Sequence, residues 1–184
     1  MSEQKLEYLY KLDYSPAVES GIWWGRIAAI VIAIDLVFTL ASLSAYSLIS
    51  QMDISINVER SLTSIVNTGE ILAAIVFFLL LVVFMASGIT GLRKTQSTGS
   101  LTHVACLSAV SGLITGAMAA AALVVSNVVI RLNTMPQAGY VTMFSQFSPD
   151  SIFNILLWVP IIALVAVVAG ICYSGFSGSI KKMY

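Results

Sequence analysis

Four stretches of this sequence run for more than twenty residues with at most two charged side chains each. They cover about residues 22–49, 65–92, 101–130 and 152–175. A helix of about 20 apolar residues crosses the hydrocarbon core of a bilayer. Lipid admits only helices and closed barrels, because it offers no hydrogen bonds to free backbone groups. We therefore predict an all-α integral membrane bundle of four transmembrane helices, forming a single domain over residues 1–184.

The composition agrees with a chain surrounded by lipid. Hydrophobic residues make up 58% of the sequence and charged residues only 10%, whereas a soluble domain carries about a quarter charged residues. The formal net charge is zero and no basic run is present, so we expect the bilayer as a partner and no nucleic acid. Glu3, Lys5 and Glu7 stand where a cleaved signal peptide has its basic and short apolar regions. The first stretch is therefore predicted to be an uncleaved span of a multi-pass protein, in a plasma or organelle membrane.

The basic residues predict the orientation. Cytoplasmic connections of membrane proteins carry an excess of Lys and Arg, and seven of the nine basic residues fall on one side of the predicted membrane. We therefore expect both the N-terminus and the C-terminus to be cytoplasmic. The seven are Lys5, Lys11, Arg26, Arg93, Lys94, Lys181 and Lys182, while Arg60 and Arg131 fall on the other side.

The connections between the spans are short, and only residues 131–151 form a longer loop. In this loop Tyr140, Phe144 and Phe147 recur at helical spacing. The spacing is compatible with a short amphipathic helix in the membrane interface and equally with an irregular loop that carries aromatic anchors.

Small residues recur at four-residue spacing in three of the spans. Hydrophobic burial does not drive helices together inside lipid, so close packing of small residues must do so. These stripes predict faces that pack either within the bundle or against a partner chain, and the sequence leaves both uses open. We expect the stripe of the third span to be central to the bundle. The residues are Gly21 and Gly25 in the first span, Ser108, Gly112 and Gly116 in the third, and Gly170 and Ser174 in the fourth.

Asp35 is the only ionisable residue near the middle of a span. A charged side chain at this depth costs about 2.5 to 3.5 kcal/mol on insertion scales, and the other spans offer no basic residue at the same depth. We expect the neutral acid, with Thr39 or Thr115 as hydrogen-bond partner. One interpretation is a site for a proton or cation. The other is a structural acid that bonds between helices or pairs with a basic residue of another subunit.

Glu70 is a second candidate ion or proton site, near the start of the second span. In one interpretation its side chain extends toward water, as charged side chains near helix ends do. In the other it forms an outer vestibule together with Asn127 and Asn154, because each lies in the outer part of its span.

The sequence offers no set of residues for catalysis or for a cofactor. His103 is the only histidine, so neither a Ser-His-Asp arrangement nor paired histidine ligation of haem is available. Cys106 and Cys172 are too far apart for a metal or redox motif, and we expect both to be free thiols. We therefore predict no catalytic residue, no cofactor, no metal and no enzymatic activity.

Two functions follow from these features. The first is a non-catalytic membrane subunit whose small-residue faces dock against other membrane subunits or against copies of itself. The alternative is a small oligomeric channel or proton-coupled carrier with Asp35 in its pathway.

Overall fold

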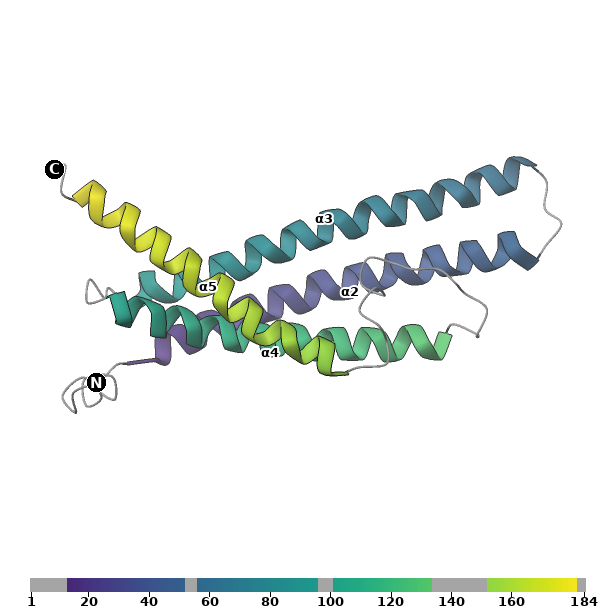
Figure 1. The fold of residues 1–184 in the computed structure, drawn as a ribbon. Coiled ribbons are helices and arrows are strands. Elements are labelled where there is room, and N and C mark those ends of the chain that lie inside the picture. The colour runs from purple at the N-terminus through teal and green to yellow at the C-terminus, as the bar shows by residue number, and fades with distance from the viewer. Residues whose placement is uncertain (1–12, 52–55, 96–100, 134–151, 182–184) are drawn as a thin grey trace.

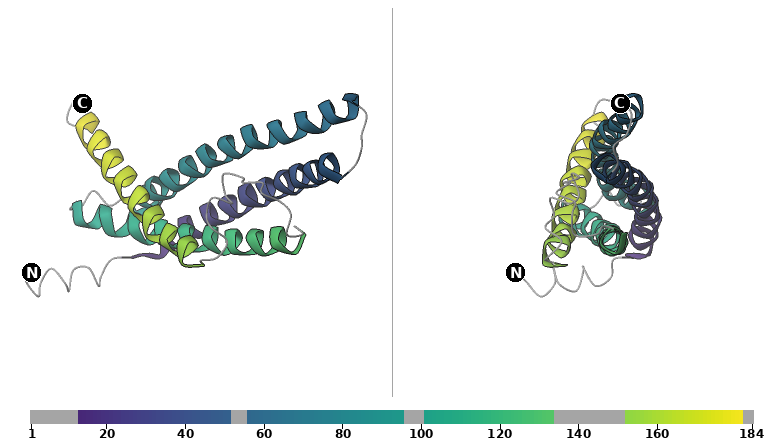
Figure 2. Two further views of the ribbon diagram at one scale, coloured as in Figure 1. Left: turned by 45° about the vertical axis from the view of Figure 1, so that its right-hand side comes forward. Right: turned by 90° about the vertical axis from the view of Figure 1, so that its right-hand side faces the viewer.

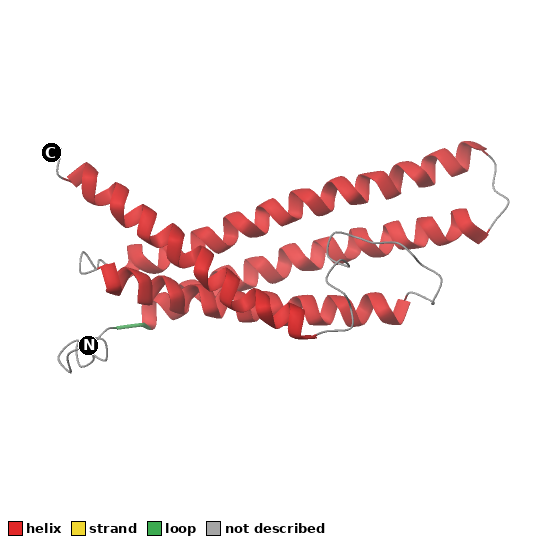
Figure 3. Cartoon of the chain, in the orientation of Figure 1, coloured by secondary structure: helices red, strands yellow, loops and turns green. Residues whose placement is uncertain are grey.

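The structure is a computed structural model, and it describes residues 13–51, 56–95, 101–133 and 152–181. Within these ranges every residue after Tyr14 is helical and no strand occurs (Figure 3). The four helices are α2 (Ser15–Gln51), α3 (Ile56–Thr95), α4 (Leu101–Asn133) and α5 (Ile152–Lys181). The prediction of an all-α bundle of four helices is confirmed. The loop with Tyr140, Phe144 and Phe147, for which the sequence allows an amphipathic helix or an irregular structure, lies outside the described residues.

All four helices are long and apolar enough to cross a membrane. Their outward faces are apolar too, because Val37, Phe78 and Leu164 are each roughly two-thirds exposed. A helix that is apolar on every side belongs in lipid or in the core of a large protein. These features indicate a multi-pass membrane protein. The cytoplasmic placement of the two chain ends stays a prediction.

All four helices are longer than the spans predicted from the sequence, and the difference is largest for α2 and α3. α2 has 37 residues and α3 has 40, which at 1.5 Å per residue correspond to about 56 and 60 Å. The hydrocarbon core is only about 30 Å thick, so we expect both helices to tilt or to project past it. The side-chain oxygen Oδ1 of Asp13 accepts a hydrogen bond from the Ser15 amide at 3.0 Å and caps the helix.

The helices α2, α3 and α4 run side by side, and α5 lies obliquely across α3 and α4 (Figures 1 and 2). We call the half of the bundle that contains Ser15 and Lys181 the terminal half; it comprises residues 15–32, 79–95, 101–119 and 160–181. The other half, formed by residues 33–51, 56–78, 120–133 and 152–159, is the distal half. The last turns of α5 project away from the other helices, and Gly175 has no neighbouring atom within 4 Å of where a Cβ would be.

The apolar core lies where all four helices meet. Its buried residues include Ala28 and Ile32 of α2, Leu80 and Phe84 of α3, and Ala119 of α4. Ile162 of α5 completes this cluster. The core therefore sits between the terminal and distal halves and separates the polar groups of one from those of the other.

Candidate functional site

The small-residue stripes pack against helices of the same chain. A Cβ on Gly21 would lie 2.8 Å from the Ser111 carbonyl oxygen, and one on Gly25 would lie 2.5 Å from the Met118 sulfur. These two glycines therefore bring α2 onto α4. Gly69 does the same for α2 and α3, because a Cβ there would collide with the Ser42 hydroxyl.

The stripe of α4 faces α5. A Cβ on Gly112 would lie 2.6 Å from the Ala166 Cβ, and one on Gly116 would lie 3.2 Å from the Val159 carbonyl oxygen. A Cβ on Gly170 would collide with the Ser108 hydroxyl. These faces are used inside the chain, and α4 packs with α2 on one side and α5 on the other. Ser174, the last residue of the predicted stripe, is half-buried.

A group of hydroxyl side chains joins α2, α3 and α4 in the terminal half. We call it the hydroxyl network, and it consists of Ser20, Ser87, Thr90, Ser108, Ser111 and Thr115 together with Trp24. The Ser20 and Thr90 hydroxyl oxygens are 2.6 Å apart, and the Trp24 indole N–H donates to the Thr90 hydroxyl at 2.7 Å. These bonds tie the start of α2 to the end of α3.

The α4 hydroxyls of this network bond to backbone carbonyls of α3 and α2. Ser111 donates to the Ser87 carbonyl at 2.8 Å, and Ser108 donates to the Gly88 carbonyl at 3.3 Å. Thr115 donates to the Gly21 carbonyl at 3.2 Å. Each of these three α4 side chains is fully buried, and interhelical bonds of this kind hold membrane helices together.

Asp35 lies on the opposite side of the apolar core, in the distal half. It is nine residues beyond the exposed Arg26, about 14 Å along the helix at 1.5 Å per residue. Its side chain is only 7% exposed. Among the residues that the structure describes, none makes a hydrogen bond or ion pair with Asp35. Thr115 was predicted as a hydrogen-bond partner of Asp35, but its hydroxyl bonds within the hydroxyl network instead.

Three more buried hydroxyl groups accompany Asp35. Thr39 and Ser42 follow it at one and two turns on the same face of α2, and Ser126 lies on α4. No hydrogen bond is formed by these three hydroxyls within the described ranges. We call Asp35, Thr39, Ser42 and Ser126 the Asp35 face.

The helix register places these residues at similar depth. α2 and α4 run parallel, with Gly21 against Ile114 and Gly25 against Met118, so Asp35 is level with about residue 128 of α4. Ser126 is within one turn of that level. In the antiparallel α2–α3 pair, Ser20 meets Thr90 and Ser42 meets Gly69, which places Asp35 opposite the buried Val76.

Along α2, the buried face changes character at Asp35. Toward the terminal half it continues with Ile32 and Ala28, both in the apolar core. Toward the distal end it continues with Thr39 and Ser42. α5 does not reach this level in the part of the chain that is described, because it begins at Ile152 and Val159 already lies against Gly116 (Figure 1). Of the polar groups near Asp35, Thr39 and Ser42 therefore lie on its distal side, and Ser126 lies at about the level of Asp35 itself.

The structure does not test the second predicted ion or proton site, at Glu70. The side chains of Glu70 and Asn154 lie outside the described residues, and the Asn127 side-chain amide donates to the Leu123 carbonyl of its own helix at 2.9 Å. An outer vestibule formed by these three residues stays a prediction.

The remaining titratable groups are scattered. His103 is buried near the start of α4, Cys106 is half-buried, and Cys172 is exposed. In the described portion of the chain, no three His, Cys, Asp or Glu side chains gather as metal ligands do.

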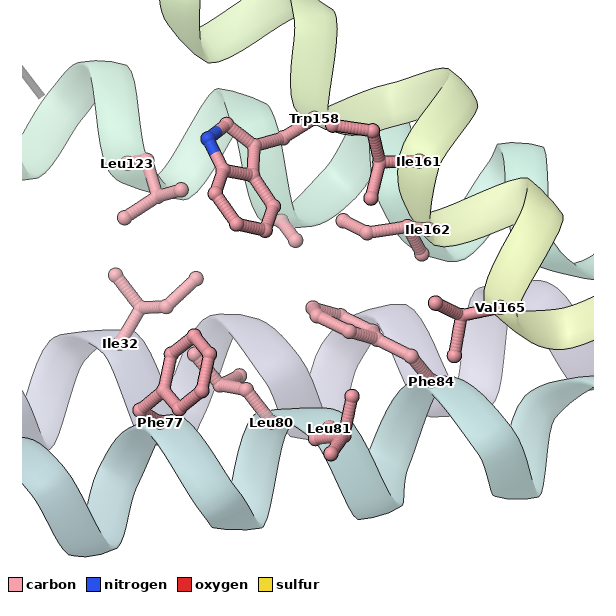
Figure 4. A pocket seen from close by; sticks show the side chains of 11 residues that line it. Ile32, Phe77, Leu80, Leu81, Phe84, Leu123, Trp158, Ile161, Ile162 and Val165 are labelled. Carbon is pink, nitrogen blue, oxygen red and sulfur yellow. The ribbon is translucent and has the colours of Figure 1, made fainter.

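A cavity of about 140 Å³ lies between all four helices (Figure 4). It begins at Ile32, one turn of α2 from Asp35 toward the terminal half. Ile32 contributes to it from α2, Phe84 from α3 and Ala119 from α4. Figure 4 shows the α3 side chains facing those of α5 across the gap, with the carbon edge of Trp158 turned toward it. The full lining is Ile32, Phe77, Leu80, Leu81, Phe84, Ala119, Leu123, Trp158, Ile161, Ile162 and Val165.

Comparison with protein-family models, with curated proteins and with solved structures finds no match for this chain. The function is therefore inferred from the geometry of the Asp35 face and its surroundings.

Sequence analysis missed the hydroxyl network and the cavity. Ser108, Ser111 and Thr115 recur at helical spacing, which places them on one face of α4, and this was the available signal for the network. Its partners Ser20, Ser87 and Thr90 lie on other helices, and no local pattern connects them. The cavity residues are ordinary apolar residues in sequence.

Proposed function

We propose that this protein is a non-catalytic membrane carrier or channel component that binds a proton or a small cation at Asp35. The carboxyl group of Asp35 is buried within a candidate membrane span, Ser15–Ala45, without a hydrogen bond or counter-charge among the described residues, and this observation carries the proposal. An ionisable group inside a membrane is costly and marks a functional site by default. A bound proton or cation removes the charge that makes burial unfavourable.

The surroundings of Asp35 support access from the distal side. Hydroxyl and carboxylate oxygens are ligands that small hard cations and water accept, and Thr39 and Ser42 place such oxygens between Asp35 and the distal end. Toward the terminal half, the apolar core blocks any polar route. Under the predicted orientation the distal side is the outer side, so we expect the ion to reach Asp35 from outside.

Flux through reconstituted vesicles tests the proposal. Purified protein is placed in liposomes with a pH-sensitive dye inside, and a K⁺ diffusion potential drives proton movement; ²²Na⁺ uptake is measured in parallel. We expect wild-type vesicles to take up one of the two ions, and Asp35→Asn to abolish that uptake. Glu59→Gln removes an exposed acid at the start of α3 and is the matched control, with uptake unchanged. Uptake by Asp35→Asn equal to wild type, or no uptake by wild type, overturns the proposal.

Docking as a subunit is the second candidate, and one observation favours it. The small-residue faces of Gly21, Gly25, Gly112 and Gly116 are used inside the chain, so they give no support for a partner. The end of α5, however, packs on nothing near Gly175, and Phe176 is 74% exposed. Native mass spectrometry of the protein extracted from its own membrane tests this function. A fixed complex that Gly175→Trp disrupts supports docking, and a monomer contradicts it.

A further inference from the structure

We propose that the cavity between α3 and α5 is a binding site for an acyl chain of a bilayer lipid. The inference concerns a site separate from Asp35 and does not depend on the proposed function. Every side chain that lines the cavity is aliphatic or aromatic, and it draws on all four helices.

The lining excludes water as the occupant. A buried water needs two to four polar partners, and the cavity offers no polar surface. An apolar cavity of about 150 Å³ engineered into another protein stays dry and takes up small hydrocarbons. The present cavity, at about 140 Å³, has room for a comparable piece of hydrocarbon.

The cavity also opens toward the bilayer. Phe77 and Leu81 of α3 are 37% exposed and Ile161 of α5 is 47% exposed, although all three contribute to the lining. These residues form the mouth of the cavity on the lipid-facing surface. In contrast, Ile32, Ala119 and Ile162 are almost completely buried and form its floor.

The apolar lining and the opening toward lipid together indicate the occupant. A site that opens into the hydrocarbon core and rejects water is in contact with acyl chains, which are the abundant hydrocarbon there. An empty cavity forfeits the dispersion contacts of the atoms around it. An acyl chain that enters between α3 and α5 restores those contacts, and it reaches as far as Ala119 in the centre of the bundle.

Photolabelling of the floor residues tests the inference. The full chain is reconstituted into phosphatidylcholine vesicles that contain a phosphatidylcholine with a diazirine in the middle of one acyl chain. Light expels N₂ from the diazirine, and the resulting carbene inserts into a neighbouring C–H bond. Labelled residues are mapped by mass spectrometry. We expect label at Ile162 and Ala119 in addition to the surface residue Phe78, which lipid contacts from outside.

Two variants that close the cavity sharpen the result. Ala119→Leu fills the floor and Leu81→Trp closes the mouth, and each should remove the label from Ile162 while leaving it on Phe78. Their matched controls are Ala121→Leu and Val82→Trp, which introduce the same side chains on exposed faces of the same helices and should retain the label at Ile162. Circular dichroism and size exclusion show whether each variant is folded, and either closing variant alone suffices.

Three outcomes overturn the inference. The first is label confined to exposed residues such as Phe78 in the wild type. The second is label at Ile162 that persists in both folded closing variants. The third is a second copy of the chain cross-linked over Phe77 and Ile161, since a protein side chain then fills the mouth.

Discussion

The two halves of the bundle differ in whether their buried polar side chains form hydrogen bonds. In the terminal half, Ser20, Ser111 and Thr115 bond to neighbouring helices. In the distal half, Asp35, Thr39 and Ser126 are also buried but form no hydrogen bond within the described ranges. Satisfied polar groups fix a unique packing, whereas unsatisfied ones cost free energy. This contrast gives the hydrogen bonds of the terminal half a role in holding the helices together, and it is the basis for proposing an ion site in the distal half.

The largest effect is expected from crowding the helix contact at Gly112. Gly112→Leu drives a side chain into Ala163 and Ala166 of α5, and overpacking of this kind costs roughly 1 to 3 kcal/mol or more. We expect loss of the folded bundle in SDS titrations followed by circular dichroism. Gly175→Leu is the control, because it meets open space and should leave the unfolding midpoint unchanged or raised. Equal midpoints for the two variants contradict the packing described here.

Replacing Asp35 is expected to increase stability. Asp35→Leu removes a buried acid that has no bonding partner in the described chain, and insertion scales assign such an acid a cost of up to about 3 kcal/mol. The unfolding free energy in mixed micelles should therefore rise while ion uptake is lost. A decrease in stability would show that Asp35 makes a structural contact, and it would favour the structural interpretation.

Removing a hydroxyl from the network should cost a smaller amount. Ser111→Ala deletes the 2.8 Å bond to the Ser87 carbonyl at a fully buried site. Interhelical hydrogen bonds in membranes are worth about 0.6 kcal/mol on average and up to about 1.7 kcal/mol, so we expect a loss of about 1 kcal/mol in the same titration. No loss would mean that close packing alone holds α3 and α4 together.

The smallest effect is expected for the corresponding change in the distal half. Ser126→Ala removes a buried hydroxyl that has no bond in the described residues, so the unfolding free energy should change by less than about 0.5 kcal/mol or rise slightly. Measured beside Ser111→Ala, it tests the contrast between the halves directly. Similar losses for both variants would abolish that contrast.

The helices could be predicted from the sequence because each span is a local signal. Residues 73–86 alone supply an apolar run that only a membrane or a large core accommodates. The stripe of α4 also identified Gly112 and Gly116 as packing positions. Which helix each stripe meets depends on contacts between distant residues, such as Gly112 with Ala166, and no local pattern contains that information.

The candidate site was predictable in the same limited sense. Asp35 stands out because an acid at mid-membrane depth is rare. Its lack of a partner depends on where Thr115 bonds, and that bond joins α4 to Gly21 of α2 across 94 positions of the sequence. Ser126 resembles any serine of a membrane helix until the fold buries it.

The lengths of α2 and α3 have a consequence for the bilayers that this chain tolerates. Both helices are longer than the hydrocarbon core is thick. Toward their distal ends, Ser44, Thr63 and Thr68 bond to carbonyls of their own helix. A thicker membrane therefore covers turns that are helical beforehand, and a thinner one exposes turns whose polar groups are satisfied. We therefore expect hydrophobic mismatch to be accommodated by moving the lipid boundary along two preformed helices, without repacking the apolar core beside Asp35.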